Sequence, residues 1–111
     1  MKYYLLVFSI CLIGSNLFPI NSQAQFSQQG NKLVGTGAVG TFVYQGYSVS
    51  ISADGNTAIV GGIGDNNSAG AAWVFTRTGG VWSQQGSKLV GTGVTGSVAI
   101  QGRSVSLSAD G

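Results

Sequence analysis

Hydrophobic and polar residues alternate strictly over residues 47–52 (YSVSIS), with three larger apolar side chains on one side and three serines on the other. A period of two is typical of a half-buried β-strand. Residues 53–56 (ADGN) carry turn chemistry, because Gly and Asn tolerate positive φ and Asp bonds to its own backbone. The apolar run 57–61 (TAIVG) then predicts a second strand, so that the two strands form a hairpin.

The next part of the chain predicts two further strands. Residues 62–70 are polar and glycine-rich and predict a loop, whereas residues 71–77 (AAWVFTR) are rich in β-branched and aromatic residues. A turn at residues 78–80 leads into a fourth strand, expected at residues 81–90 with a bulge around Gly86. Helix signals are absent downstream of residue 25. The unit is therefore expected to be a four-stranded antiparallel meander.

The chain repeats itself. Residues 27–55 return as residues 83–111 with a period of 56 and no gap, and 20 of the 29 aligned positions are identical. A fixed period of this size indicates a repeat architecture. The first repeat is thus 27–82, and the second, partial repeat is 83–111.

A four-stranded unit at this period fits the blade of a β-propeller better than a coil of a β-helix, which needs far fewer residues. With residues 26–35 as an outer strand, we expect an all-β fold of four-stranded antiparallel blades, about one and a half of which are present. A propeller needs at least four blades, and one blade leaves both apolar faces uncovered. The chain is therefore expected either to be a fragment of a longer protein, which we favour, or to assemble.

The N-terminus predicts export. Lys2, the apolar run 5–13 and the small-residue pattern 22–24 together indicate a secretory signal peptide over residues 1–24. The apolar run is much shorter than the roughly 20 residues that span a bilayer. We therefore expect residues 25–111 to be secreted or held at the cell surface, with no membrane span.

Composition excludes several function classes. The only cysteine, Cys11, lies in the predicted signal, and the chain has no histidine. Disulfides, a thiol nucleophile, the usual triad base and the commonest zinc ligand are therefore unavailable to the mature region. From residue 25 onward, the chain has four cationic and three acidic side chains. The cations are scattered along the sequence, so no patch could neutralise several phosphates. Nucleic-acid binding is not expected.

The run 46–62 (GYSVSISADGNTAIVGG), followed by 71–91 (AAWVFTRTGGVWSQQGSKLVG), resembles the FG-GAP repeat family. Those repeats form the propeller of integrin α-subunits and occur in tandem in many secreted bacterial proteins. The resemblance covers residues 26–111. The signature FG reads Gln45-Gly46 here, and the GAP position reads Gly61-Gly62-Ile63.

The resemblance also implies a possible calcium loop, because family members often carry D-x-D-x-D-G-x-x-D between strands. The matching loop begins at Asp65, and Asn67 and Gly70 also fit, but Ala69 and Trp73 replace two ligand positions. Calcium takes six to eight oxygen ligands, and this loop offers one carboxylate. We therefore expect no cofactor and no metal, with Asp65 and Asn67 as the residues that calcium would use.

Two glycine motifs do not indicate a nucleotide site. Residues 35–40 and 91–96 both satisfy G-x-G-x-x-G. In a dinucleotide-binding fold a helix must follow the motif, because its N-terminus holds the pyrophosphate. The residues that follow, 41–44 and 97–100, are mostly β-branched, apolar or aromatic, so the motifs predict connections between repeats.

The remaining candidate side chains have simpler roles. Asp54 and Asp110 each stand alone at a hairpin tip, where a turn role is expected rather than a catalytic pair. Four aromatic residues could stack on sugars, but their positions favour packing between blades. They are Tyr44, Trp73, Phe75 and Trp82.

These observations predict a non-catalytic, secreted or cell-surface repeat segment for protein or carbohydrate binding or adhesion. No catalytic residues are expected, so the chain is not expected to be an enzyme. The alternative is an accessory repeat region of a larger extracellular enzyme, and a third possibility is a structural stalk. The expected partners are a protein or glycan ligand and further blades, either in cis or by self-assembly.

Overall fold

The computed structural model describes residues 26–96 and 98–111. The predicted signal peptide, residues 1–24, lies outside the described residues. Within the described part, no helix is long and apolar enough to cross a membrane.

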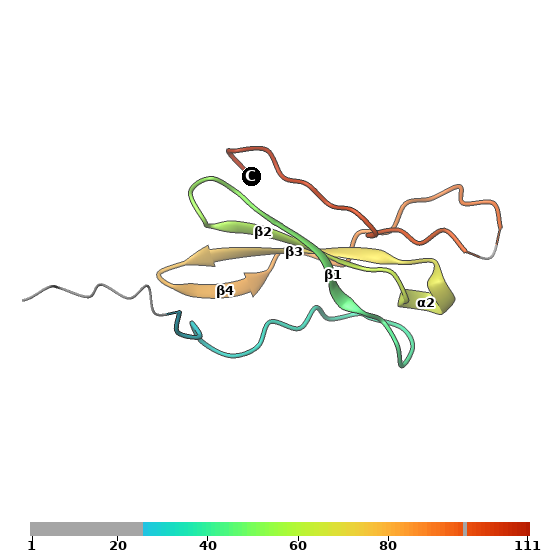
Figure 1. Cartoon of the computed structure of the whole chain (residues 1–111), viewed down its shortest axis with the longest axis horizontal. Coiled ribbons are helices and arrows are strands. Elements are labelled where there is room, and N and C mark those ends of the chain that lie inside the picture. Colours follow the sequence, from blue (N-terminus) through green and yellow to red (C-terminus); the bar gives the residue numbers. More distant parts are fainter. Residues whose placement is uncertain (1–25, 97) are drawn as a thin grey trace, which may run out of the picture.

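The centre of the molecule is one antiparallel sheet (Figure 1). Its strands are β1 (Gln45–Ile51), β2 (Thr57–Gly62), β3 (Ala71–Thr78) and β4 (Val81–Gln84), and they lie side by side in chain order. Sequential antiparallel neighbours need only short connections, and these are the turns that the sequence predicts. The all-β, four-stranded antiparallel meander is confirmed.

The core lies on one side of this sheet. Trp73 is fully buried and Phe75 is 3% exposed, and the paired position on β2 places Val60 beside Trp73. The indole Nε1 of Trp73 donates a hydrogen bond to the carbonyl oxygen of Thr36 at 2.8 Å, which satisfies the buried N–H group. Thr36 belongs to the N-terminal segment (residues 26–44), which therefore covers this side of the sheet.

Two adjacent glycines at the end of β2, Gly61 and Gly62, allow other segments of the chain to approach the sheet closely, one on each side. A Cβ on Gly61 would overlap the carbonyl oxygen of Gly102, whereas one on Gly62 would lie within 3.0 Å of the Trp73 ring and the Val43 carbonyl oxygen. Successive strand residues face opposite sides. The N-terminal segment and the C-terminal segment (residues 98–111) thus cover opposite sides of the sheet, and they lie on either side of it in Figure 1.

The predicted alternation in β1 is present, and the serine side is the one covered by the C-terminal segment. Ser48 Oγ donates to the carbonyl oxygen of Gly102 at 2.6 Å, and the Leu107 N–H donates to Ser50 Oγ at 3.1 Å. Ser52 is 3% exposed. The small hydroxyl side chains let the next segment approach closely and provide hydrogen bonds to its backbone.

The sequence repeat is also a repeat of contacts. The Gly35 N–H donates to Gln45 Oε1 at 2.7 Å, and Gln45 Nε2 donates to the Gly35 carbonyl at 2.9 Å. Gln101 forms the same pair of hydrogen bonds with Gly91, at 2.5 and 3.2 Å. These glycines open the two G-x-G-x-x-G loops, and no helix follows either loop in the described residues. The loops are connections, as predicted.

Two predicted strands differ from the observed ones. Residues 26–35 form no strand, because no neighbouring strand in the described part pairs with them. β4 ends at Gln84, the Gln85 N–H still donates to the Val74 carbonyl oxygen at 2.8 Å, and the chain pairs with β3 again where Leu89 lies opposite Ala72. Leu89 lies five residues after Gln84, whereas their partners on β3, Ala72 and Phe75, are three residues apart. The chain therefore bulges by two residues near Gly86.

The predicted loop at residues 62–70 contains one turn, α2 (Asp65–Ser68). Asn66 and Asn67 have φ of 47° and 56°, a left-handed conformation that asparagine tolerates better than most residues. The Asn66 N–H donates to the carbonyl oxygen of Val39 at 2.8 Å. The turn is therefore attached to the N-terminal segment.

Candidate functional site

The calcium candidate Asp65 lies at a junction of three segments. Its side chain is 1% exposed, and its Oδ1 accepts a hydrogen bond from the Val39 N–H at 2.7 Å. Its Oδ2 lies 2.5 Å from the Nζ of Lys88, whose side chain is 18% exposed. Asp65 thus links the N-terminal segment, α2 and the stretch after β4 through one buried carboxylate.

The residues of this loop do not fit a calcium site. Both Asp65 oxygens are already engaged by an N–H group and an ammonium group, and Asn67 is exposed whereas Asp65 is buried. In residues 26–96 and 98–111, no three His, Cys, Asp or Glu side chains gather in one place. A lysine beside the carboxylate opposes a divalent cation there.

The other two carboxylates hold turns. Asp54 Oδ1 accepts hydrogen bonds from Ser52 Oγ at 2.7 Å and from the Asn56 N–H at 2.9 Å. These bonds, above all the one from Ser52, lower the pKa of Asp54 below its ordinary value of 3.8. In the second copy, Ser108 Oγ donates to Asp110 Oδ1 at 2.6 Å. Both carboxylates therefore have the predicted turn role.

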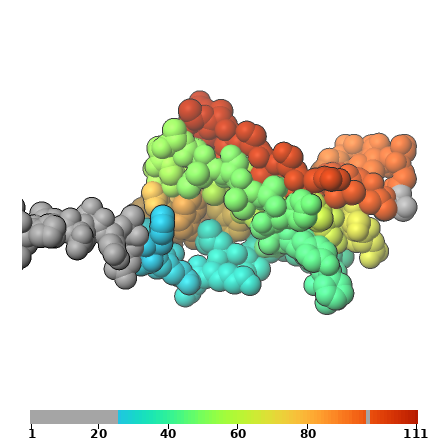
Figure 2. All heavy atoms as spheres, viewed as in Figure 1, coloured from blue at the N-terminus to red at the C-terminus, as the bar shows by residue number. Residues whose placement is uncertain are grey.

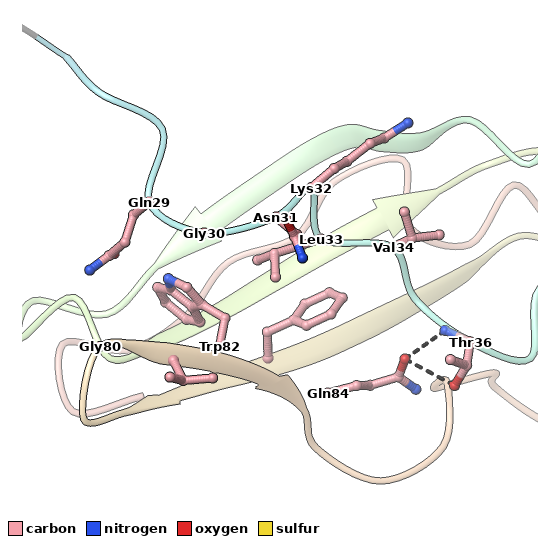
Figure 3. A pocket seen from close by; sticks show the side chains of 12 residues that line it. Gln29, Gly30, Asn31, Lys32, Leu33, Val34, Thr36, Gly80, Trp82 and Gln84 are labelled. Carbon is pink, nitrogen blue, oxygen red and sulfur yellow. Dashed lines mark hydrogen bonds between the residues drawn. The ribbon is translucent and has the colours of Figure 1, made fainter.

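A cavity of about 480 Å³ lies between the N-terminal segment and β4 (Figure 3). Its volume falls within the range of about 300–1,000 Å³ that is common for ligand pockets. Apolar side chains, primary amides and the Lys32 side chain share its lining. The apolar ones are Leu33, Val34, Phe75, Val81 and Trp82, and the amides belong to Gln29, Asn31 and Gln84.

Trp82 is held in position by its neighbours across the strand pair. Arg77 lies opposite Trp82 on β3, and its guanidinium carbon is 5.4 Å from the centroid of the indole ring, a cation–π geometry. Arg77 is itself fixed, because its Nη1 donates to Gln29 Oε1 and its Nε donates to Asn56 Oδ1, each at 3.1 Å. The half-buried indole is thus a fixed wall of the cavity.

Gln84 holds the opposite end of the cavity together. Its Oε1 accepts hydrogen bonds from the Thr36 N–H at 2.6 Å and from Thr36 Oγ1 at 3.2 Å, as Figure 3 shows. Its Nε2 donates to the Gly86 carbonyl at 2.9 Å. An aromatic wall can stack on the apolar face of a sugar or a flat side chain, and amides both donate to and accept from hydroxyl groups.

The four aromatic candidates separate into two groups. Trp73 and Phe75 are in the core of the sheet, and Trp82 packs against that core, whereas packing between blades stays a prediction. Trp82 lines the cavity, and Tyr44 is 59% exposed beside Phe42, with ring centroids 6.2 Å apart. Sequence reasoning missed the grouping of Trp82 with Arg77 and Gln29. The strand register would place Arg77 opposite Trp82, but no sequence signal brings Gln29 there.

No family model matches the chain. Comparison with curated proteins finds no match, and comparison with solved structures finds none either.

Proposed function

We propose that the chain is a non-catalytic repeat segment of an FG-GAP-like β-propeller that is secreted or held at the cell surface and binds a carbohydrate or a protein. The four-stranded meander is the unit that such a blade requires. The hydrogen-bond pairs that recur 56 residues apart support a tandem arrangement of this unit.

The roles of the carboxylates support a non-catalytic assignment. Asp54 caps the β1–β2 hairpin turn, Asp110 caps the turn at residues 108–111, and Asp65 forms a buried ion pair with Lys88. General acid–base chemistry needs a titratable group that faces substrate. Each acidic side chain of residues 26–111 instead has a structural hydrogen-bond partner.

The cavity wall formed by Trp82 is the observation that carries the binding function. A fixed indole beside the Asn31 amide and the Gln29 amide nitrogen favours a ligand with one apolar face and several hydroxyl groups, which describes a hexose unit. The Gln84 amide is engaged by Thr36 and Gly86 and shapes the cavity instead. The Arg77 guanidinium is engaged by two amide oxygens and does not line the cavity, so Lys32 is the charged side chain of the lining.

Isothermal titration calorimetry of the full secreted chain against soluble neutral oligosaccharides tests this function. Trp82→Leu should weaken binding at least tenfold, about 1.4 kcal/mol, whereas Trp82→Phe should retain most of it. Gln85→Ala is the matched control, because Gln85 is exposed on the same hairpin and does not line the cavity. Absence of binding by every oligosaccharide, or equal binding by Trp82→Leu, would refute the carbohydrate assignment.

A further inference from the structure

The cavity beside Trp82 is bridged at both of its ends. At one end, Arg77 Nη1 donates to Gln29 Oε1 at 3.1 Å, which ties the N-terminal segment to β3 opposite Trp82. At the other end, the Thr36 N–H donates to Gln84 Oε1 at 2.6 Å, which ties the same segment to β4. Figure 3 shows Gln29 and the Thr36–Gln84 pair on opposite sides of the lining. The two bridges therefore close the cavity along its length.

Each bridge is anchored a second time. Arg77 also donates to Asn56 Oδ1 at 3.1 Å, and its guanidinium lies over the indole ring of Trp82. The Thr36 carbonyl oxygen accepts a hydrogen bond from the buried Trp73 Nε1 at 2.8 Å. A ligand that ran through the cavity from end to end would have to break both bridges and leave their polar groups unpaired, which is unfavourable. A ligand is therefore expected to enter between the bridges.

The side of the cavity between the bridges is open to solvent. Val81, which lines the cavity, is 69% exposed, and Figure 2 shows the N-terminal segment, in cyan, at the edge of the molecule. Asn31 is exposed, and Figure 3 shows its amide between the N-terminal segment and the β3–β4 hairpin. Gln29 uses its Oε1 in the bridge, so its amide nitrogen remains for a ligand. The opening thus presents hydrogen-bonding groups beside an apolar wall.

We propose that this cavity binds the terminal unit of a glycan chain and not an internal stretch of it. The proposal rests on the carbohydrate-binding function proposed above. The terminal sugar ring stacks on Trp82 and forms hydrogen bonds with Asn31 and Gln29, while the rest of the chain leaves through the open side. An internal unit has a neighbour on each side, and a cavity bridged at both ends leaves one way out.

Titration calorimetry of the full secreted chain with linear oligosaccharides of increasing length tests the proposal. The probes are glucose oligomers with α-1,4 links, glucose oligomers with β-1,4 links and mannose oligomers with β-1,4 links, each with two to six units. In a series that binds, the dissociation constant per molecule should stay within about twofold at every length, because each molecule offers one such end. A site for internal units would bind longer oligomers more tightly, since they offer more overlapping positions.

Two variants of the lining separate the closed end from the contacts with the ring. Gln84→Ala removes one bridge, so the six-unit oligomer should bind at least about fivefold more tightly than the two-unit one. Asn31→Ser is the matched control, because Ser87 is the counterpart of Asn31 in the second copy. It should weaken binding by a similar factor at every length. Circular dichroism should show that both variants retain the sheet.

The outcomes distinguish this proposal from the function on which it rests. Wild-type binding that strengthens with length would overturn the terminal-unit proposal and leave the carbohydrate function standing. Gln84→Ala that binds every length alike would contradict the assignment of its bridge as a closed end. Absence of binding by all three series would overturn both proposals together.

Discussion

The buried pair between Asp65 and Lys88 should be the strongest single polar contribution to the stability of this fold. Lys88→Met removes the charge that faces the Asp65 carboxylate and keeps most of the apolar stem. The carboxylate, 1% exposed, is then left with the Val39 N–H as its hydrogen-bond donor. Asp65→Asn instead leaves the Lys88 ammonium beside a neutral amide.

The expected magnitudes follow from the burial of each partner. Removing one member of a buried ion pair lowers the free energy of unfolding by about 3–5 kcal/mol, because the other charge stays buried without an opposite charge beside it. Lys88→Met should fall in this range. Asp65→Asn should fall at its lower end, since the 18% exposed Lys88 side chain can reach water. The double variant leaves no unpaired charge, so it should lose about 2 kcal/mol less than the two single losses added together.

Urea unfolding of the wild type, the two single variants and the double variant measures the free energy of unfolding of each protein in this double-mutant cycle. The fluorescence of Trp73 reports the transition, because this indole is fully buried in the folded state. Thr76→Ala, at a half-buried β3 position away from the pair, provides a reference for an ordinary substitution. If each single variant lost less than about 1 kcal/mol and the losses were additive, the pair would behave like an exposed surface ion pair and the reasoning would fail.

Two further results are expected. Calcium at about 10 mM should leave the melting temperature unchanged relative to sodium chloride of equal ionic strength. Even a site with a dissociation constant of about 1 mM would add about 1.4 kcal/mol and raise it by roughly 6–11 °C, so such a rise would restore the calcium site at Asp65. The lowered pKa of Asp54 means that its stabilising effect is complete above its ordinary value of 3.8 and is lost as the pH falls through the folded-state value. The difference in urea midpoint between wild type and Asp54→Asn should therefore shrink below about pH 4, and a constant difference would contradict this.

Local sequence patterns predicted the elements that depend on nearby residues. The β1–β2 hairpin, β3 and the bulge near Gly86 follow from alternation, β-branched content and turn residues, all of which act within a few positions. The prediction of a strand at residues 26–35 was wrong, although the counterpart stretch includes most of β4. A strand exists only where another strand pairs with it, and the sequence of the stretch itself does not supply that partner.

The sequence by itself determined the repeat period, which is read directly from the aligned residues. It also determined the antiparallel meander and the turn roles of Asp54 and Asp110, because these follow from contacts between elements or residues that are neighbours in the chain. Only the tertiary structure decided which side of β1 is covered and which is open. It also decided that Asp65 pairs with Lys88, 23 residues away, and that Gln29 meets Arg77 across 48 residues. These contacts join segments that approach the sheet from elsewhere in the chain, and no local pattern of residues encodes which segments will meet.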